Sequence, residues 1–152
     1  PSNQMRIATK SSIINVSTEK KLRQFANNLS KKLKQGDTFF LFGEMGVGKT
    51  TLVKYLINNL QIQCNQNITE VTSPTFNIMN EYKIDDLLIK HYDLYRLKSP
   101  EELKDLNLFD ESEKSVLLIE WPQIIKKEPN SVIKLYFEYK NDYQDRFINV
   151  IN

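Results

Sequence analysis

The stretch LFGEMGVGKTTL, residues 41–52, contains three of the four glycines of this 152-residue chain. Gly43 is followed by four residues and then by Gly48, Lys49 and Thr50, which is the spacing G-x-x-x-x-G-K-[ST] of a phosphate-binding loop. Glycine lets the backbone adopt positive φ and approach a phosphate without a Cβ atom in between. Backbone N–H groups at the start of the following helix would then bind the anion, helped by the helix dipole. The stretch therefore predicts a nucleotide site.

The polar residues of this motif have defined tasks in nucleotide hydrolysis. Lys49 would reach the β- and γ-phosphates, and the hydroxyl of Thr50 would bind Mg²⁺. A protein that reads guanine should carry the motif N/T-K-x-D, and the nearest letters, KNDY at 140–143, have neither that order nor a strand before them. ATP or ADP with Mg²⁺ is therefore the predicted ligand. A strand-to-helix turn that binds nothing is the disfavoured alternative.

Two carboxylates follow apolar runs, Asp93 in LLIKHYDLYRL and Glu120 in VLLIEW. Strand ends beside a phosphate loop are where ligands collect in α/β proteins, so these side chains could position Mg²⁺ or its water. The alternatives are a helix or turn cap for Asp93 and a surface charge that ends the strand for Glu120. The segment TSPTF, residues 72–76, offers three hydroxyls that could act as a switch on the metal or the γ-phosphate. An ordinary Ser-Pro turn explains that segment equally well.

Other reactive side chains are few. His91 is the only histidine, and its place among strand-type residues favours a packed, hydrogen-bonded residue over a catalytic base. Arg96 and Arg146 are candidate phosphate contacts, although a salt bridge to a neighbouring carboxylate is the favoured interpretation. The sequence lacks the arginine-rich lid of small-molecule kinases. Because little positive charge is available at the γ-phosphate, slow hydrolysis by the isolated chain is expected.

Composition and charge are those of an ordinary globular protein. The net charge of +2 gives no support for a surface that coats nucleic acid. Cys64 is the only cysteine, so an intrachain disulfide is impossible. No apolar run approaches the roughly 18 residues of a membrane span and no signal peptide is recognised, so a cytoplasmic location without membrane contact is expected. Met5 is interpreted as the natural start, which would make residues 1–4 an appended remnant.

Strands and helices must alternate to position these side chains. Strands are predicted at 12–16, 38–42, 77–84, 87–95, 115–121, 132–139 and 146–151. Helices are predicted from a cap at Ser17 or Thr18 to about Lys34, from the cap Ser99 onward, and over 50–60 with Leu52, Tyr55, Leu56 and Leu60 inward. This order predicts one α/β domain over residues 1–152, a P-loop NTPase-like mixed β-sheet flanked by helices, with C-terminal antiparallel strands.

The segments GEMGVGKTTL, VTSPTFNIMNEY, HYDLYRL, PEEL and IEWPQ, in this order and spacing, resemble the bacterial TsaE (YjeE) ATPases. The resemblance covers about Phe42 to Pro122, roughly half of the chain. It implies an ATPase that works with the TsaB and TsaD proteins to make threonylcarbamoyladenosine beside the anticodon of tRNAs that read codons starting with adenine. TsaD would carry the transferase chemistry, ATP hydrolysis would reset the complex, and tRNA would be met only through that complex.

The same resemblance implies a set of site residues. Thr50 and Glu120 would bind Mg²⁺, and Asp93 would be the Walker-B-like acid. Thr75 would be the switch-type hydroxyl in catalysis, alongside Lys49 and Asp93. The nucleotide would contact the motif residues Met45, Gly46, Val47, Gly48, Lys49 and Thr50. Asp93 and the indole of Trp121 would lie close to it, and the loop at Thr18 and Glu19 would approach the adenine.

Two other functions remain open at this point. A small-molecule kinase would need a lid and an acceptor pocket with a general base. A direct tRNA-binding module with a structural nucleotide is poorly supported by the balance of 21 basic and 19 acidic residues. A partner-stimulated ATP hydrolase therefore remains the favoured prediction.

Overall fold

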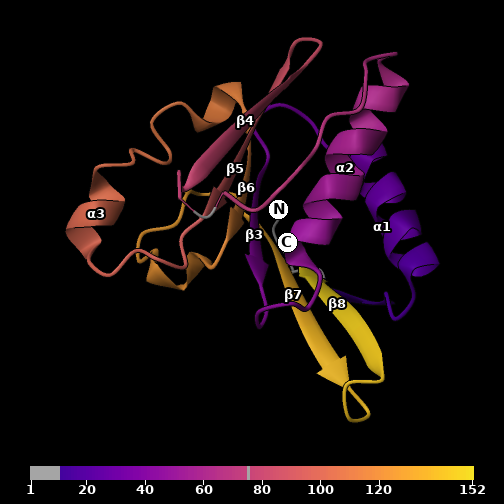
Figure 1. Cartoon of the computed structure of the whole chain (residues 1–152). Coiled ribbons are helices and arrows are strands. Elements are labelled where there is room, and N and C mark those ends of the chain that lie inside the picture. Colours follow the sequence, from indigo (N-terminus) through magenta and orange to yellow (C-terminus); the bar gives the residue numbers. More distant parts are fainter. Residues whose placement is uncertain (1–10, 75) are drawn as a thin grey trace, which may run out of the picture.

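The structure is a computed structural model that describes residues 11–74 and 76–152 (Figure 1). Two expectations fall outside these residues. One is the assignment of Met5 as the start with residues 1–4 as a remnant, and the other is the switch role of Thr75. Within the described residues no helix has the length and apolar character needed to cross a membrane.

A seven-stranded mixed sheet forms the centre of the fold, in the order β2-β8-β7-β3-β6-β5-β4. Strand β3 is parallel to both of its neighbours, β6 and β7, and β5 is parallel to β6. The hairpins β4–β5 and β7–β8 are antiparallel, as the sequence predicted. The strand bounds are β2 Ser11–Asn15, β3 Thr38–Phe42, β4 Met79–Ile84, β5 Leu87–Asp93, β6 Val116–Glu120, β7 Ile133–Lys140 and β8 Asp145–Ile151.

Helices cover both faces of this sheet. Helices α1 (Glu19–Lys32) and α2 (Lys49–Gln63) pack together on one face, and the short α3 (Pro100–Lys104) lies on the other (Figure 1). Two 3₁₀ turns, η1 (Ser112–Lys114) and η2 (Pro122–Ile124), flank β6 along the chain. The central strand β3 serves both cores, because Phe39 and Leu41 join the cluster under α1 and α2 while Phe40 joins the cluster on the other face. The predicted α/β sheet flanked by helices is thus confirmed.

Helix α1 begins and ends for local reasons. Thr18 is its N-cap, since its backbone is extended and its Oγ1 accepts a hydrogen bond from the Lys21 N–H at 3.2 Å. The helix ends at Lys32, two residues before the predicted end, because the backbone of Leu33 is extended, and the bond from the Leu33 N–H to the Leu29 carbonyl is the last helical one. Thr18, rather than Ser17, therefore fixes the start of the helix.

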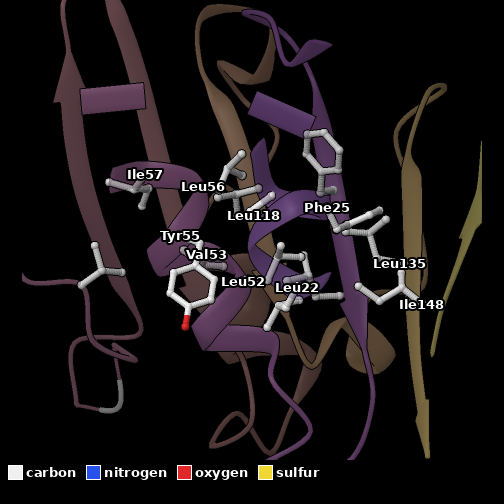
Figure 2. Packing of buried hydrophobic residues seen from close by; sticks show 14 of the residues in the cluster. Leu22, Phe25, Leu52, Val53, Tyr55, Leu56, Ile57, Leu118, Leu135 and Ile148 are labelled. Atoms are coloured by element: carbon white, nitrogen blue, oxygen red, sulfur yellow. The ribbon is translucent and has the colours of Figure 1, made fainter. Parts of the chain in front are cut away.

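The packing of α2 holds its first turn in place (Figure 2). Leu52, Tyr55, Leu56 and Leu60 are buried as predicted. Val53 and Ile57 are also buried, and they belong to the same core cluster as these residues. Each buried aliphatic side chain contributes about 1.5–3 kcal/mol. The N-terminus of α2 is therefore anchored firmly next to the ends of β5 and β6.

Candidate functional site

Residues 43–48, called here the glycine loop, connect the end of β3 to the start of α2. Gly43 and Gly48 have φ of +148° and +117°, a region that favours glycine. A Cβ atom on Gly43 would also lie 2.9 Å from side-chain atoms of Phe137 and Val47. The chain can make this turn only with glycine at these positions, which is the steric reason the sequence analysis gave for them.

The β7–β8 hairpin holds the outer side of the glycine loop. The Tyr139 hydroxyl donates to the Gly46 carbonyl, and Nη1 of Arg146 donates to the Val47 carbonyl, both at 3.2 Å. Because a peptide group is planar and trans, fixing the Val47 carbonyl turns the next N–H, that of Gly48, to the opposite side of the loop. Sequence reasoning missed these contacts, since nothing local in the sequence links the hairpin to the loop.

The salt bridges predicted for Arg96 and Arg146 are wrong. No carboxylate in residues 11–74 or 76–152 lies within ion-pair distance of either guanidinium. Arg96 instead lies over the ring of Phe76, 4.8 Å from its centroid. Arg146 therefore has a backbone carbonyl as its partner and Arg96 an aromatic ring, where a carboxylate had been predicted for each.

An open cavity of about 320 Å³ lies between the glycine loop and the ends of β5 and β6. Eight of the predicted site residues line it, namely Met45, Gly46, Gly48, Lys49, Thr50, Asp93, Glu120 and Trp121. The other lining residues are Thr51, Ser73, Tyr95 and Arg96. Val47 does not line it, because its side chain is in the core. Residues from four separate segments of the chain therefore converge on one cavity.

The two carboxylates meet because of strand register. Asp93 and Glu120 are the last residues of the parallel neighbours β5 and β6, and they are directly paired in the sheet. Side chains alternate between the faces of a strand, so His91 and Asp93 point to the same face. That face carries α2, since Glu120 reaches Thr50 on this helix. The H-x-D pattern in the sequence thus delivers both side chains to the cavity side of the sheet.

A buried chain of hydrogen bonds links α2 to β6 and β5. The Thr50 hydroxyl donates to Oε2 of Glu120 at 2.9 Å, and Nε2 of His91 contacts the same oxygen at 2.6 Å. Glu120 is only 2% exposed, so the surface-charge interpretation of this residue is wrong. His91 is completely buried, and the prediction of a packed, hydrogen-bonded histidine is confirmed. A carboxylate kept this far from water needs such partners.

Asp93 connects the TSPTF segment to the cavity. Ser73 donates its hydroxyl to Oδ2 of Asp93 at 2.8 Å, and the Tyr95 N–H donates to Oδ1 at 3.0 Å. The second bond is an Asx turn, so the predicted turn cap is present. The first bond brings Ser73 to the cavity. Of the hydroxyls in this segment, only that of Thr75 had been predicted to act at the site. The three hydroxyls around Pro74 were the available signal.

Lys49 is 4% exposed and lines the cavity. Its Nζ donates to the Gly43 carbonyl and lies 3.7 Å from the centroid of the Trp121 ring. Burial lowers the pKa of the Lys49 ammonium, and the nearby carboxylates of Glu120 and Asp93 offset part of that effect. A phosphate would be a stronger partner for this cation than a carbonyl and an aromatic face.

Trp121 has a backbone conformation that is uncommon for a bulky residue. Its φ is +56°, in the left-handed region, directly after the carboxylate of Glu120. Its ring packs against Tyr95 with 4.8 Å between centroids. Strained residues of this kind concentrate at ligand sites. The turn places the indole in the cavity wall beside the Lys49 ammonium.

Thr18 and Glu19 do not line this cavity. Thr18 is engaged in capping α1, and Oε1 of Glu19 accepts from the Tyr55 hydroxyl at 2.7 Å and from Arg23 at 2.9 Å. The hydrogen bond from Tyr55, followed by the contact with Arg23, lowers the pKa of the Glu19 carboxyl. An adenine contact at these residues stays a prediction, since the structure joins them to the middle of α2.

The oxygen ligands of the cavity suit magnesium. Thr50 and Ser73 supply hydroxyls, while Asp93 and Glu120 supply carboxylates. In the described part of the chain no group of three or more His, Cys, Asp or Glu residues could hold a metal unaided. Mg²⁺ usually binds through one or two carboxylates, waters and the phosphates of a nucleotide. The residues present therefore fit a magnesium ion that arrives with its nucleotide.

Comparison with known proteins gives a consistent result. The family model described as "Threonylcarbamoyl adenosine biosynthesis protein TsaE" matches residues 16–148. A protein of Rickettsia bellii named tRNA threonylcarbamoyladenosine biosynthesis protein TsaE is 36% identical over 149 residues, covering 97% of this chain and 99% of the relative. A protein of the same name from Rickettsia felis is 40% identical over 111 residues, covering 73% of this chain. The chain spans only 63% of the length of that second relative.

A solved structure shares the architecture. The crystal structure of YdiB from Bacillus subtilis matches with a TM-score of 0.74, covering 96% of this chain and 88% of that one. At 23% sequence identity this likeness supports the fold alone.

Proposed function

This chain belongs to the TsaE family of threonylcarbamoyladenosine biosynthesis proteins, and from this premise we propose that it is the subunit that binds and hydrolyses Mg-ATP. One observation carries the proposal. The motif residues Lys49 and Thr50 share a cavity with Glu120, a carboxylate from a distant strand that is bonded directly to Thr50. A lysine, a hydroxyl and a carboxylate in this relation are what binding of a nucleotide phosphate tail with its metal requires.

Each side chain has a task in the proposed hydrolysis. The N–H groups of the glycine loop and the Lys49 ammonium bind the phosphates, while Thr50 and Glu120 hold magnesium, which neutralises charge on the phosphate oxygens. Asp93 and Ser73, already bonded to each other, orient the attacking water with the Thr75 hydroxyl as the switch. Water oxygen bonds to the γ-phosphorus as the bond from that phosphorus to the bridging oxygen breaks, and ADP and phosphate are released.

The proposed partners are the TsaB and TsaD proteins, and tRNA is reached through their complex in the cytoplasm. The described lining of the cavity contains two cationic side chains, Lys49 and Arg96. Arg96 is held over Phe76, so little positive charge is directed at the γ-phosphate. A site of this kind should hydrolyse ATP slowly until a partner protein rearranges its side chains.

We expect phosphate release from ATP to be slow with the isolated protein and to rise when TsaB and TsaD are added. The measurement is release of inorganic phosphate from labelled ATP, with TsaB and TsaD alone as the control. A small-molecule kinase would instead transfer label to an added acceptor, and a direct tRNA-binding module would shift tRNA in a salt-sensitive way without partners. Either of those results, combined with unchanged phosphate release, would contradict the proposal.

Nucleotide binding should change the fluorescence of Trp121, the only tryptophan of the chain. The Lys49 ammonium lies 3.7 Å from the centroid of this ring and should move toward the phosphates when ATP or ADP binds. Removing a cation from an indole alters its emission, so a titration should give a saturable change. Addition of Mg²⁺ without nucleotide is the control. A flat titration in protein that calorimetry shows to bind ADP would refute the proximity of Trp121 to the nucleotide.

A further inference from the structure

We propose that His91 is a positioning residue that fixes the Glu120 carboxylate for magnesium. The inference rests on the proposed function, because it assumes that Glu120 is a metal ligand. Its basis is the contact of 2.6 Å between Nε2 of His91 and Oε2 of Glu120. Oε2 also accepts the hydrogen bond from Thr50, so both contacts occupy the same oxygen. Within the described residues Oε1 has no such partner and is the oxygen left for a metal ligand.

The imidazole is oriented by its surroundings. His91 is fully buried in β5, a strand paired on both sides, with Asn80 of β4 opposite it on one side and Leu118 of β6 on the other. An ionised carboxylate can only accept a hydrogen bond, so Nε2 of His91 carries the hydrogen that points at Glu120. Thr50 belongs to the helix next to the glycine loop, whereas His91 holds Glu120 from the rigid sheet. The carboxylate is thereby kept in one rotamer.

The second nitrogen of the ring supports a functional reason for the histidine. Nδ1 of His91 is buried and has no hydrogen-bond partner among the described residues. A buried polar atom without a partner costs about 1–3 kcal/mol, and an apolar side chain of similar volume would avoid that cost. Packing alone therefore does not account for a histidine here. Among the residues that the structure describes, the bond from Nε2 to Glu120 is the one contact that an apolar side chain could not provide.

Two variants separate positioning from packing. His91→Leu removes the donor and keeps an apolar side chain, while His91→Gln retains an N–H donor at about the distance of Nε2 from the backbone. Calorimetry gives the affinity for ADP with Mg²⁺ and with EDTA, and the ratio of the two is the gain due to magnesium. Outer residues that orient metal ligands typically contribute about 10- to 100-fold in metal affinity. We expect this ratio to be about 10- to 100-fold smaller in His91→Leu than in the unaltered protein. In His91→Gln the ratio should be close to that of the unaltered protein.

The affinity for ADP in EDTA should be unchanged in both variants, because His91 does not line the cavity. Ser115→Ala is the matched control, since Ser115 is also buried with an oxygen that has no partner among the described residues, but it directly precedes β6, at the end opposite Glu120. The proposal would be overturned if the ratio of ADP affinities with Mg²⁺ and with EDTA in His91→Leu were within about twofold of that of the unaltered protein. Equal loss of affinity with and without magnesium, together with a lower unfolding temperature, would show a purely structural role. If the unaltered protein itself showed no magnesium gain, the metal role of Glu120 in the proposed function would fail first.

Discussion

Replacing Lys49 with alanine is expected to reduce ATP hydrolysis about 10²- to 10³-fold, the typical cost of removing one donor that stabilises developing negative charge. Binding of ADP should weaken about 10- to 100-fold, because a hydrogen bond to a charged group contributes about 1.5–3 kcal/mol. Lys49 supplies the one ammonium among the described lining residues of the cavity. Phosphate release and calorimetry with ADP measure the two effects.

Loss of activity in the Lys49→Ala variant should not result from unfolding. Burial lowers the pKa of Lys49, so the folded protein holds this charge at some cost, and its removal offsets part of the stability lost with the contacts to the Gly43 carbonyl and the Trp121 ring. Lys54→Ala is the control, since Lys54 is an exposed lysine of the same helix outside the cavity lining. Turnover of Lys49→Ala within about twofold of the unaltered protein would count decisively against a phosphate site at the glycine loop.

Much of the cavity could be predicted because its parts are local patterns with steric causes. The glycine loop follows from the spacing of Gly43 and Gly48, because both have positive φ and a Cβ atom on Gly43 would also clash with Phe137 and Val47. Asp93 and Glu120 could be found because apolar strands end at them. In parallel strands such ends lie at the same edge of the sheet, and here the two residues are directly paired.

The rest depends on long-range pairing that no local pattern encodes. The C-terminal hairpin was predicted, but its place beside β3 and its contacts from Tyr139 and Arg146 to the glycine loop follow from strand order. The same holds for His91, whose role depends on a partner 29 positions away. Helix α1 ended before the predicted residue because the backbone of Leu33 is extended, which stops the helix although the apolar pattern continues to this residue.

Replacing Glu120 with glutamine should lower magnesium-dependent hydrolysis and raise the Mg²⁺ concentration that it requires, while leaving the fold intact. The amide oxygen of glutamine can accept the hydrogen bonds that Thr50 and His91 now give to Oε2. Its NH₂ group would then occupy the place of Oε1 in the cavity, and an amide hydrogen repels a cation. Because a catalytic metal contributes several kcal/mol to stabilising the transition state, Mg²⁺-dependent turnover should fall about 100-fold or more.

The measurement for Glu120→Gln is phosphate release over a series of Mg²⁺ concentrations, accompanied by ADP affinity with Mg²⁺ and with EDTA. The affinity in EDTA should be near that of the unaltered protein, because the glycine loop and Lys49 remain. Glu120→Ala should behave worse in a thermal melt, since it leaves the buried Nε2–H of His91 without an acceptor, at a cost of about 1–3 kcal/mol. An unchanged half-saturating Mg²⁺ concentration in the glutamine variant would refute Glu120 as a metal ligand. Since the amide preserves both hydrogen bonds, that outcome could not be attributed to misfolding.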